Sequence, residues 1–270
     1  MKSLILTFIL SIAACAAWAH EGITEDNYMR ADSLLWTDYN SGMLELLELK
    51  QQKPEASDSI DREMQNLYTA TSAQNIELAK KYAATPSGMQ RMYMCRANIP
   101  KDTLSQKLAF VPAELRDSYY GRLVKQHIET RQLREGDMFE TFSCTGSDGK
   151  SYDWSMAEGK YILIVYSGLS CMGDSGREGL ERLHSEFCPG RLEIVVYQNA
   201  SDPENLRAID EAYSMHSPSV SDFLNEASPV RILYGAQATP TCIFVSPSRR
   251  IVNIYTGFSY DRYAPLITGQ

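Results

Sequence analysis

A single cysteine, Cys171, follows an apolar run and precedes a glycine-rich stretch, in the sequence YILIVYSGLSCMGD that covers residues 161–174. This pattern is typical of a buried strand that leads into a helix. A thiol at the start of a helix lies at the positive end of the helix dipole, which favours the nucleophilic thiolate form. Three residues later, where a dithiol redox site has its second cysteine, the chain has Asp174. The spacing therefore predicts the redox chemistry of one thiol.

Asp174 has two interpretations that the sequence leaves open. Its carboxylate could act as a general base for Cys171, provided that the two side chains come within hydrogen-bonding distance. It could instead be a first-turn acidic residue that complements the helix dipole and, being negative, disfavours the thiolate. Arg177 lies three residues further along the same helical face and could partly neutralise this charge.

A second candidate element is the sequence QATPTCIFV at residues 237–245, where Thr239 and Pro240 come just before an apolar strand. A proline in such a turn, facing a cysteine at a helix start, suggests a cis Thr239–Pro240 peptide bond. That geometry would leave the backbone of Thr239 beside Cys171, where an extended peptide could pair with it by β-strand addition. We therefore expect Thr239 and Pro240 to shape a substrate site.

The elements that must position these residues lie in the second half of the chain. Apolar and β-branched runs predict five strands, at 139–144, 161–166, 192–197, 242–245 and 251–256, the last two joined as an antiparallel hairpin. Helices are predicted between them, at 174–187, 202–215 and around 230–234. Buried strands that alternate with helices indicate an α/β layer.

The first half of the chain has a helical and strand-free pattern. Its apolar periodicity predicts helices at 27–39, 41–51, 58–82, 87–96, 102–110 and 113–132. No ligand-like cluster occurs there, so we interpret it as an all-α accessory region. The expected division is a signal peptide at 1–19, a helical domain at 20–133 and an α/β domain at 134–270.

The chain start predicts export. Lys2, an apolar stretch and the sequence Ala-Trp-Ala before His20 form a cleavable secretory signal, although Ile12–Cys15 could alternatively be a lipobox that anchors Cys15 to a membrane. The formal net charge of −8 and the absence of a Lys/Arg run argue against nucleic acid as a partner. Cleavage would leave five cysteines, an odd number, so at least one is unpaired within the chain.

The order of these motifs resembles that of thioredoxin-like proteins. The closest resemblance is to periplasmic thiol-disulfide oxidoreductases of the ResA/TlpA type and the related AhpC/TSA group. It rests on Gly136-Asp137, Gly159-Lys160 before the apolar strand, Cys171, the Thr239-Pro240 turn and Thr256-Gly257. The resemblance implies an α/β thioredoxin-like fold over about residues 134–270, a central mixed sheet flanked by helices, preceded by the all-α region. It also implies periplasmic localisation, thiol or disulfide partners, and no cofactor or metal.

The sequence departs from that family at the site itself. The Trp-Cys-x-x-Cys motif becomes Ser-Cys171-Met-Gly-Asp174, and the position of the buried proton-transferring acid corresponds to Val165. Exchange by a second cysteine within the motif is thereby excluded. Three hypotheses remain: monothiol exchange resolved by an external thiol, a retired thioredoxin-fold binding module, and a weak thiol peroxidase.

The other candidate residues are expected to be structural. Cys242 is interpreted as a small buried hydrophobic residue, and Cys188 lies a helix length from Cys171. A bridge between Cys95 and Cys144 is a less favoured alternative. His184 and His216 have no partner at ligand spacing and are expected to be surface or helix-end residues.

Overall fold

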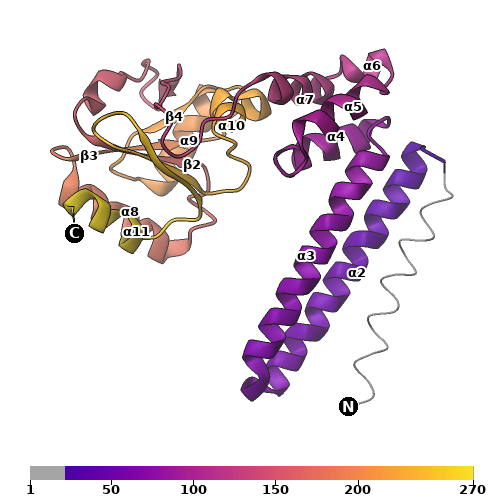
Figure 1. Ribbon diagram of the computed structural model, residues 1–270. Coiled ribbons are helices and arrows are strands. Elements are labelled where there is room, and N and C mark those ends of the chain that lie inside the picture. Colours follow the sequence, from indigo (N-terminus) through magenta and orange to yellow (C-terminus); the bar gives the residue numbers. More distant parts are fainter. Residues whose placement is uncertain (1–21, 270) are drawn as a thin grey trace. The chain divides into compact units, whose positions relative to one another are not determined.

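The computed structural model describes residues 22–269 of the chain. The chain divides into two compact units, Met1–Ile128, here called the helical unit, and Glu129–Gln270, here called the α/β unit (Figure 1). The predicted signal at 1–19, Cys15 and His20 lie outside the described residues. The boundary falls before the expected one between residues 133 and 134.

The helical unit begins with a hairpin of two long helices that lie side by side (Figure 1). These are α2 (Glu25–Gln52) and α3 (Ser57–Lys81). Shorter helices follow: α4 (Pro86–Cys95), α5 (Lys101–Ala109), α6 (Ala113–Arg116) and α7 (Tyr119–Glu129). The buried side chains of α2 are Tyr28, Ala31 and Leu35, all near its start, where α3 and α4 also contribute to the core.

Two predicted helix boundaries in this unit are wrong. The break expected near Ser41 is absent, and α2 continues through Gly42. A Cβ atom at Gly42 would lie 2.9 Å from Leu67 Cδ2 of α3. The glycine therefore serves close packing between the two helices. The predicted helix 113–132 is interrupted instead, because the Ser118 hydroxyl accepts a hydrogen bond from the N–H of Gly121 at 3.3 Å and so starts a new helix.

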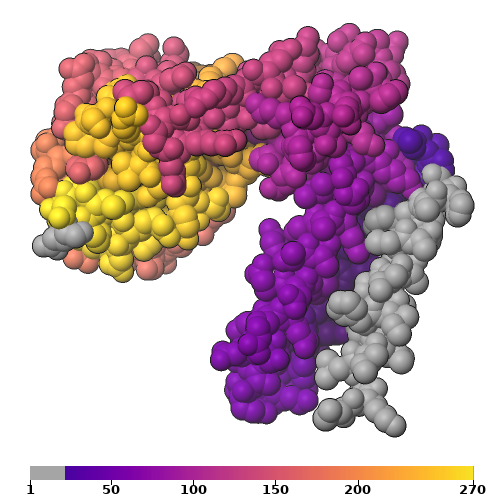
Figure 2. Space-filling model, viewed as in Figure 1, coloured from indigo at the N-terminus to yellow at the C-terminus, as the bar shows by residue number. Residues whose placement is uncertain are grey.

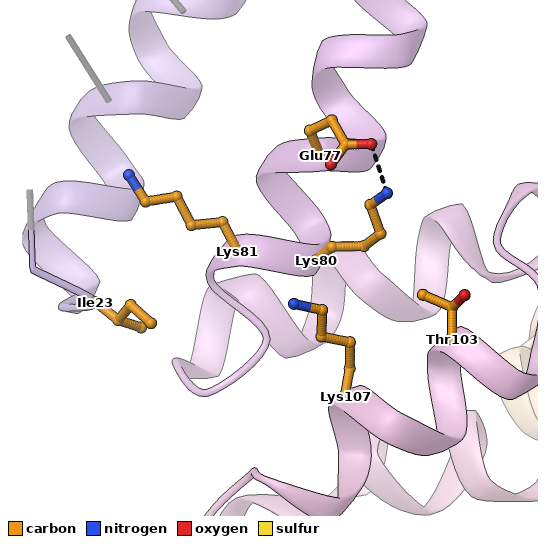
Figure 3. Close-up of a pocket in the computed structure, with 6 residues that line it drawn as sticks. All are labelled: Ile23, Glu77, Lys80, Lys81, Thr103 and Lys107. Atoms are coloured by element: carbon orange, nitrogen blue, oxygen red, sulfur yellow. Dashed lines mark hydrogen bonds and ion pairs between the residues drawn. The ribbon is translucent and has the colours of Figure 1, made fainter. Parts of the chain in front are cut away.

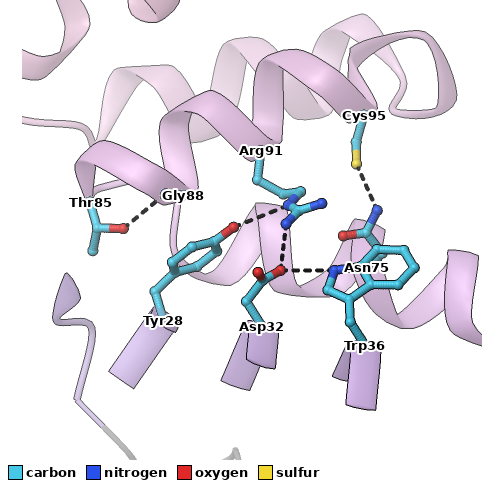
Figure 4. Close-up of polar contacts among 8 residues, drawn as sticks. All are labelled: Tyr28, Asp32, Trp36, Asn75, Thr85, Gly88, Arg91 and Cys95. Carbon is cyan, nitrogen blue, oxygen red and sulfur yellow. Dashed lines mark hydrogen bonds and ion pairs between the residues drawn. The ribbon is translucent and has the colours of Figure 1, made fainter. Parts of the chain in front are cut away.

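A polar network ties α2 to α4 in the helical unit (Figure 4). Arg91 donates hydrogen bonds to Asp32 Oδ1 at 2.5 Å and to the Tyr28 hydroxyl at 3.1 Å. The Trp36 indole also donates to Asp32 Oδ1, at 3.1 Å. The Arg91 and Asp32 side chains are only 19% and 21% exposed, so this ion pair is partly shielded from water. Removing either partner would leave a poorly solvated charge.

The α/β unit is built on a six-stranded mixed sheet in the order β1-β4-β3-β2-β5-β6. Its strands are β1 (Thr145–Gly146), β2 (Tyr161–Tyr166), β3 (Leu192–Tyr197), β4 (Ser219–Ser221), β5 (Thr241–Val245) and β6 (Ile251–Thr256). The central strand β2 runs parallel to β3 and antiparallel to β5, and β5 pairs with β6 as the predicted antiparallel hairpin. The neighbouring strands β2 and β3 are buried almost throughout.

Helices cover both faces of this sheet. On one face, α8 (Gly173–Phe187) and α11 (Tyr260–Thr268) bury Leu180, Leu183 and Ile267 against β2, β3 and β5. On the other face, α10 (Pro229–Leu233) contributes Val230 to a second core, and α9 (Pro203–Tyr213) follows β3. The C-terminal segment, yellow in Figure 2, lies at the surface of the unit. The fold is thioredoxin-like, with a helical region before it, and the fold class expected from the sequence is confirmed.

One element prediction in the α/β unit is wrong, and three elements were missed. The segment 139–144 is not a strand, because its apolar residues Phe139 and Phe142 enter the core around Trp154, whose indole N–H donates to the Phe142 carbonyl at 2.8 Å. One isolated bridge, from Met138 to Arg250, replaces the expected pairing. Strands β1 and β4 were not predicted, because two and three residues are too few to show a periodic pattern, and helix α11, which contains Pro265, was also missed.

Candidate active site

Cys171 lies on the turn between β2 and α8. The Ser167 backbone has a φ of 51° and Gly168 a φ of 86°, so the chain turns sharply as it leaves the strand. The backbone N–H groups of Cys171 and Met172 both donate to the Gly168 carbonyl, at 2.9 and 3.0 Å. Helix α8 begins only at Gly173. Cys171 thus precedes the helix instead of occupying its first turn. The thiol lies just outside the positive N-terminal end of the helix dipole.

The opposite wall of the site is the turn before β5. The Thr239–Pro240 peptide bond is cis, as the sequence suggests. The two walls touch at Gly168, where a Cβ atom would lie 2.6 Å from the Pro240 nitrogen. No side chain fits in that space. The glycine is therefore what allows the cysteine turn to reach the proline turn.

The structure brings Cys171 and Thr239 together. The Cys171 sulfur lies 3.7 Å from Thr239 Oγ1 and 3.8 Å from the Ser170 hydroxyl, both within the range of a hydrogen bond that involves sulfur. Cys171 and Thr239 are exposed, whereas Pro240 is buried. A partner can therefore approach the thiol and the Thr239 backbone from solvent at the same place.

Asp174 is placed apart from this pair. Its side chain is 90% exposed and forms an ion pair with Arg177. The Arg177 guanidinium also donates to the Leu169 carbonyl at 2.7 Å and lies over the Tyr213 ring at 5.6 Å from the ring centre. Arg177 thus binds both the backbone of the turn that carries Cys171 and the carboxylate of Asp174. Sequence reasoning gave Arg177 only the second of these contacts, because a side chain to backbone bond has no sequence signature.

The other described cysteines are poorly placed for chemistry. Cys95, Cys144 and Cys242 are buried free thiols and Cys188 is half-buried. The less favoured Cys95–Cys144 bridge would join the two units and stays a prediction. Burial raises the pKa of the Cys144 and Cys242 thiols to about 12 and that of Cys188 to about 11. Among the described residues, Cys171 is the only exposed cysteine.

No buried acid faces Cys171 from the position expected of the family. Val165 is fully buried in the core that α8 covers. A partly buried acidic residue lies on the other face of the sheet, where Asp222 accepts hydrogen bonds from the Tyr197 hydroxyl at 2.5 Å and from the Ser228 hydroxyl at 2.7 Å. Burial and the bond to Asp222 raise the pKa of Tyr197. This network closes the core beneath α10 and does not contact the thiol.

Comparisons with known proteins were informative only at the level of structure. No protein-family model matches the sequence, and no curated protein is similar to it. The α/β half is similar to several solved structures, and their chains are covered almost completely. They include a thiol-disulfide oxidoreductase from Bacteroides fragilis, with 18% identity, a TM-score of 0.43, and coverage of 48% of this chain and 99% of that one. The thioredoxin domain of a thiol-disulfide oxidoreductase from Bacteroides vulgatus has 18% identity, a TM-score of 0.45, and coverage of 51% and 99%. A thiol:disulfide interchange protein from a Bacteroides species has 18% identity, a TM-score of 0.45, and coverage of 51% and 92%.

A hollow in the helical unit is lined by Ile23, Glu77, Lys80, Lys81, Thr103 and Lys107 (Figure 3). Lys80 pairs with Glu77 at 2.5 Å. Lys80, Lys81 and Lys107 lie in the last turns of α3 and α5, where cations complement the helix dipoles. These lysines are thus explained by helix stability. Across residues 22–269, no helix has the length and apolar character needed to cross a bilayer.

Proposed function

We propose that this chain performs thiol–disulfide exchange with Cys171 as a single nucleophile. The observation that carries the proposal is that the one exposed cysteine of the described residues lies 3.7 Å from Thr239 in the turn before β5. The Cys171 thiolate attacks one sulfur of a disulfide, a mixed disulfide forms, and the second sulfur leaves as a thiolate. The substrate class is a protein or small-molecule disulfide.

An external thiol must complete the cycle. Asp174 has no sulfur, and the remaining described thiols are buried or have pKa values raised by burial. The external thiolate attacks the mixed disulfide at the partner's sulfur, forms a new disulfide with the partner, and releases the Cys171 thiolate. Each step exchanges one sulfur–sulfur bond for another, so electrons balance without a cofactor.

Substrate binding is assigned to the turn before β5. Thr239 is exposed and lies beside the cis bond to Pro240, a position that suits pairing of its backbone with an extended peptide that carries the disulfide. Asp174 has a weaker claim to the site, because its exposed side chain pairs with Arg177 and, among the described residues, forms no hydrogen bond with Cys171. Its role as a general base is therefore secondary in this proposal.

Oxidised glutathione is a suitable probe of the reaction. The native chain should gain one glutathione on Cys171, found by mass spectrometry of the intact and digested protein, and reduced glutathione should remove it. Cys171→Ser should abolish the adduct, whereas the matched control Cys188→Ser should keep it. An adduct that forms equally fast on Cys171→Ser, or one that reduced glutathione does not release, would contradict the proposal.

A retired binding module is the second candidate. It is favoured by the position of Arg177, the cation nearest to Cys171 in the sequence. Arg177 binds Asp174 and the Leu169 carbonyl, so among the described residues the Cys171 sulfur has hydroxyl neighbours but no cation to stabilise its thiolate. In that case Cys171→Ser binds partners as the native chain does.

A weak thiol peroxidase, the third candidate, requires a sulfenic acid on Cys171 at low peroxide, which dimedone labelling detects.

We further propose that this chemistry takes place after export. The proposal rests on the signal-like residues 1–19. Expression in a bacterial host followed by fractionation and mass measurement distinguishes cleavage after Ala19, which gives a chain starting at His20, from lipidation of Cys15, which adds acyl mass. Retention of the full chain in the cytoplasm would contradict export.

A further inference from the structure

Two histidines that are distant in sequence meet on the surface of the α/β unit. Glu181 and His184 lie one turn apart on the same face of α8, whereas His216 comes from the segment between α9 and β4. The imidazole rings of His184 and His216 are stacked, with centroids 5.6 Å apart and planes inclined by 28°. His184 lies in the last turn of α8 and His216 is exposed, as expected from the sequence, but their spatial proximity was not predicted. The spacing of 32 residues hides the pair from any motif search.

Glu181 fixes the orientation of His216. One carboxylate oxygen accepts the backbone N–H of His216 at 3.0 Å, and the other lies 2.5 Å from ring nitrogen Nδ1. A carboxylate on Nδ1 keeps the proton there and leaves the lone pair on Nε2. The same carboxylate–imidazole arrangement supports histidines that bind metals, because it sets the tautomer and increases the basicity of the free nitrogen.

The two rings are close enough to share an ion once the His184 ring turns. Zinc binds imidazole nitrogen at about 2.0–2.1 Å, along the lone pair in the ring plane, and two imidazoles on one tetrahedral ion then have centroids roughly 5 Å apart. The centroids are 5.6 Å apart but the rings are stacked, so the His184 ring must rotate about its side-chain bonds before both nitrogens face one ion, whereas Glu181 holds the His216 ring. The rings border a surface hollow that Glu181, Arg182, His184, Ser185 and His216 line, so an ion there can be reached from solvent.

We propose that His184 and His216 form an exchangeable binding site for a divalent transition-metal ion, with Glu181 as a positioning residue. Neutral imidazole suits Zn²⁺ and Cu²⁺, and Cu²⁺ should bind more tightly than Zn²⁺. Among the described residues, no group of three or more His, Cys, Asp and Glu side chains is placed to hold an ion. Two protein ligands leave further positions to water or to a group on a second molecule. The ion would link α8 to the segment before β4.

A purely structural reading of the cluster makes a different prediction. If Glu181 and His216 only tie the segment before β4 to α8, His184 contributes nothing, since its ring forms no hydrogen bond with another described residue. Replacing His184 then leaves metal affinity and stability unchanged. The proposed site instead requires both imidazoles, so the two readings separate at His184.

Zinc titration of the full chain tests the proposal, in a Cys171→Ser, His20→Gln background that removes the exposed thiol and the histidine near the chain start. Calorimetry should find one Zn²⁺ per chain, and Zn²⁺ should raise the melting temperature. His184→Gln and His216→Gln should each weaken binding at least tenfold and abolish the melting-temperature shift. Glu181→Gln should weaken binding by about tenfold or more. The matched control Arg182→Gln, which changes a lining residue that is not a ligand, should bind as the background does.

Two results would overturn the site. One is a background chain that takes up no Zn²⁺ at millimolar concentration. The other is binding that persists unchanged in His184→Gln. The apo melting temperature of His184→Gln, which should match that of the background, shows that the variant is folded.

Discussion

Replacing Gly168 by alanine tests whether the contact between the two turns builds the Cys171 site. Gly168 has a φ of 86°, and a Cβ atom there would lie 2.6 Å from the Pro240 nitrogen and 2.9 Å from the Thr239 carbonyl carbon. A left-handed backbone costs an L-residue roughly 1–2 kcal/mol. The clash meets backbone atoms, which yield less than a side chain end, and overpacking of this kind costs a further ~1–3 kcal/mol. The expected loss is thus about 2–5 kcal/mol.

Gly159 provides a matched control. Its φ is 72°, but a Cβ atom there meets nothing within 4 Å. Gly159→Ala should therefore cost only the conformational part, about 1–2 kcal/mol. Hydrogen exchange of the β2 and β3 amides at increasing urea concentration measures the stability of the α/β unit itself. Alkylation of Cys171 by iodoacetamide reports on the site.

The two variants separate packing from backbone preference. Gly168→Ala should be the less stable, and it should alter the alkylation rate of Cys171, because the turn must move away from Thr239. Gly159→Ala should leave that rate unchanged. Equal losses of stability in the two variants, or an unchanged alkylation rate in Gly168→Ala, would refute the claim that this contact positions the thiol.

Three further predictions concern charges. Burial, reinforced by neighbouring cations, lowers the pKa of His127 to about 4; the unfolded chain, with a value near ~6.5, takes up this proton first. Stability from neutral His127 is therefore complete above about pH 6.5 and falls by up to ~3 kcal/mol as the pH drops to 4; urea unfolding across this range should lose that slope in His127→Gln. Arg91→Met leaves the partly buried Asp32 unpaired and should destabilise the helical unit by about 2–3 kcal/mol, measured by hydrogen exchange in α2; no loss would show that the pair is fully solvated. Arg177→Met releases the Leu169 carbonyl and should change the alkylation rate of Cys171 severalfold at constant pH; an unchanged rate would mean that the turn holds without it.

Strands were predicted most accurately where a continuous apolar run of strand length is buried in the sheet. The runs at 161–166 and 192–197 became the buried central strands, and the cis Thr239–Pro240 bond appears where the proline pattern suggested it. These elements indicated an α/β layer, and the family resemblance implied the thioredoxin-like class. Apolar content alone misled at 139–144, where large side chains fill a core without forming a ladder.

The site was predictable only in part. Cys171 and Thr239 could be placed together because both lie at ends of neighbouring strands. The exact start of α8, and therefore the position of Cys171 just before it, depends on the left-handed turn at Gly168, which sequence does not specify. The pairing of His184 with His216 depends on where the segment after α9 passes over α8. Such contacts are set by tertiary packing and leave no local trace.

The burial or partial burial of Cys95, Cys144, Cys188 and Cys242 makes Cys171 a natural labelling site. With their thiols buried or half-buried, and with pKa values raised by burial, the folded α/β unit should accept a maleimide dye at Cys171 without any cysteine being removed. The dye would sit beside the Thr239 backbone. Its emission would then change when a peptide enters, so the native chain supplies its own fluorescent reporter of occupancy.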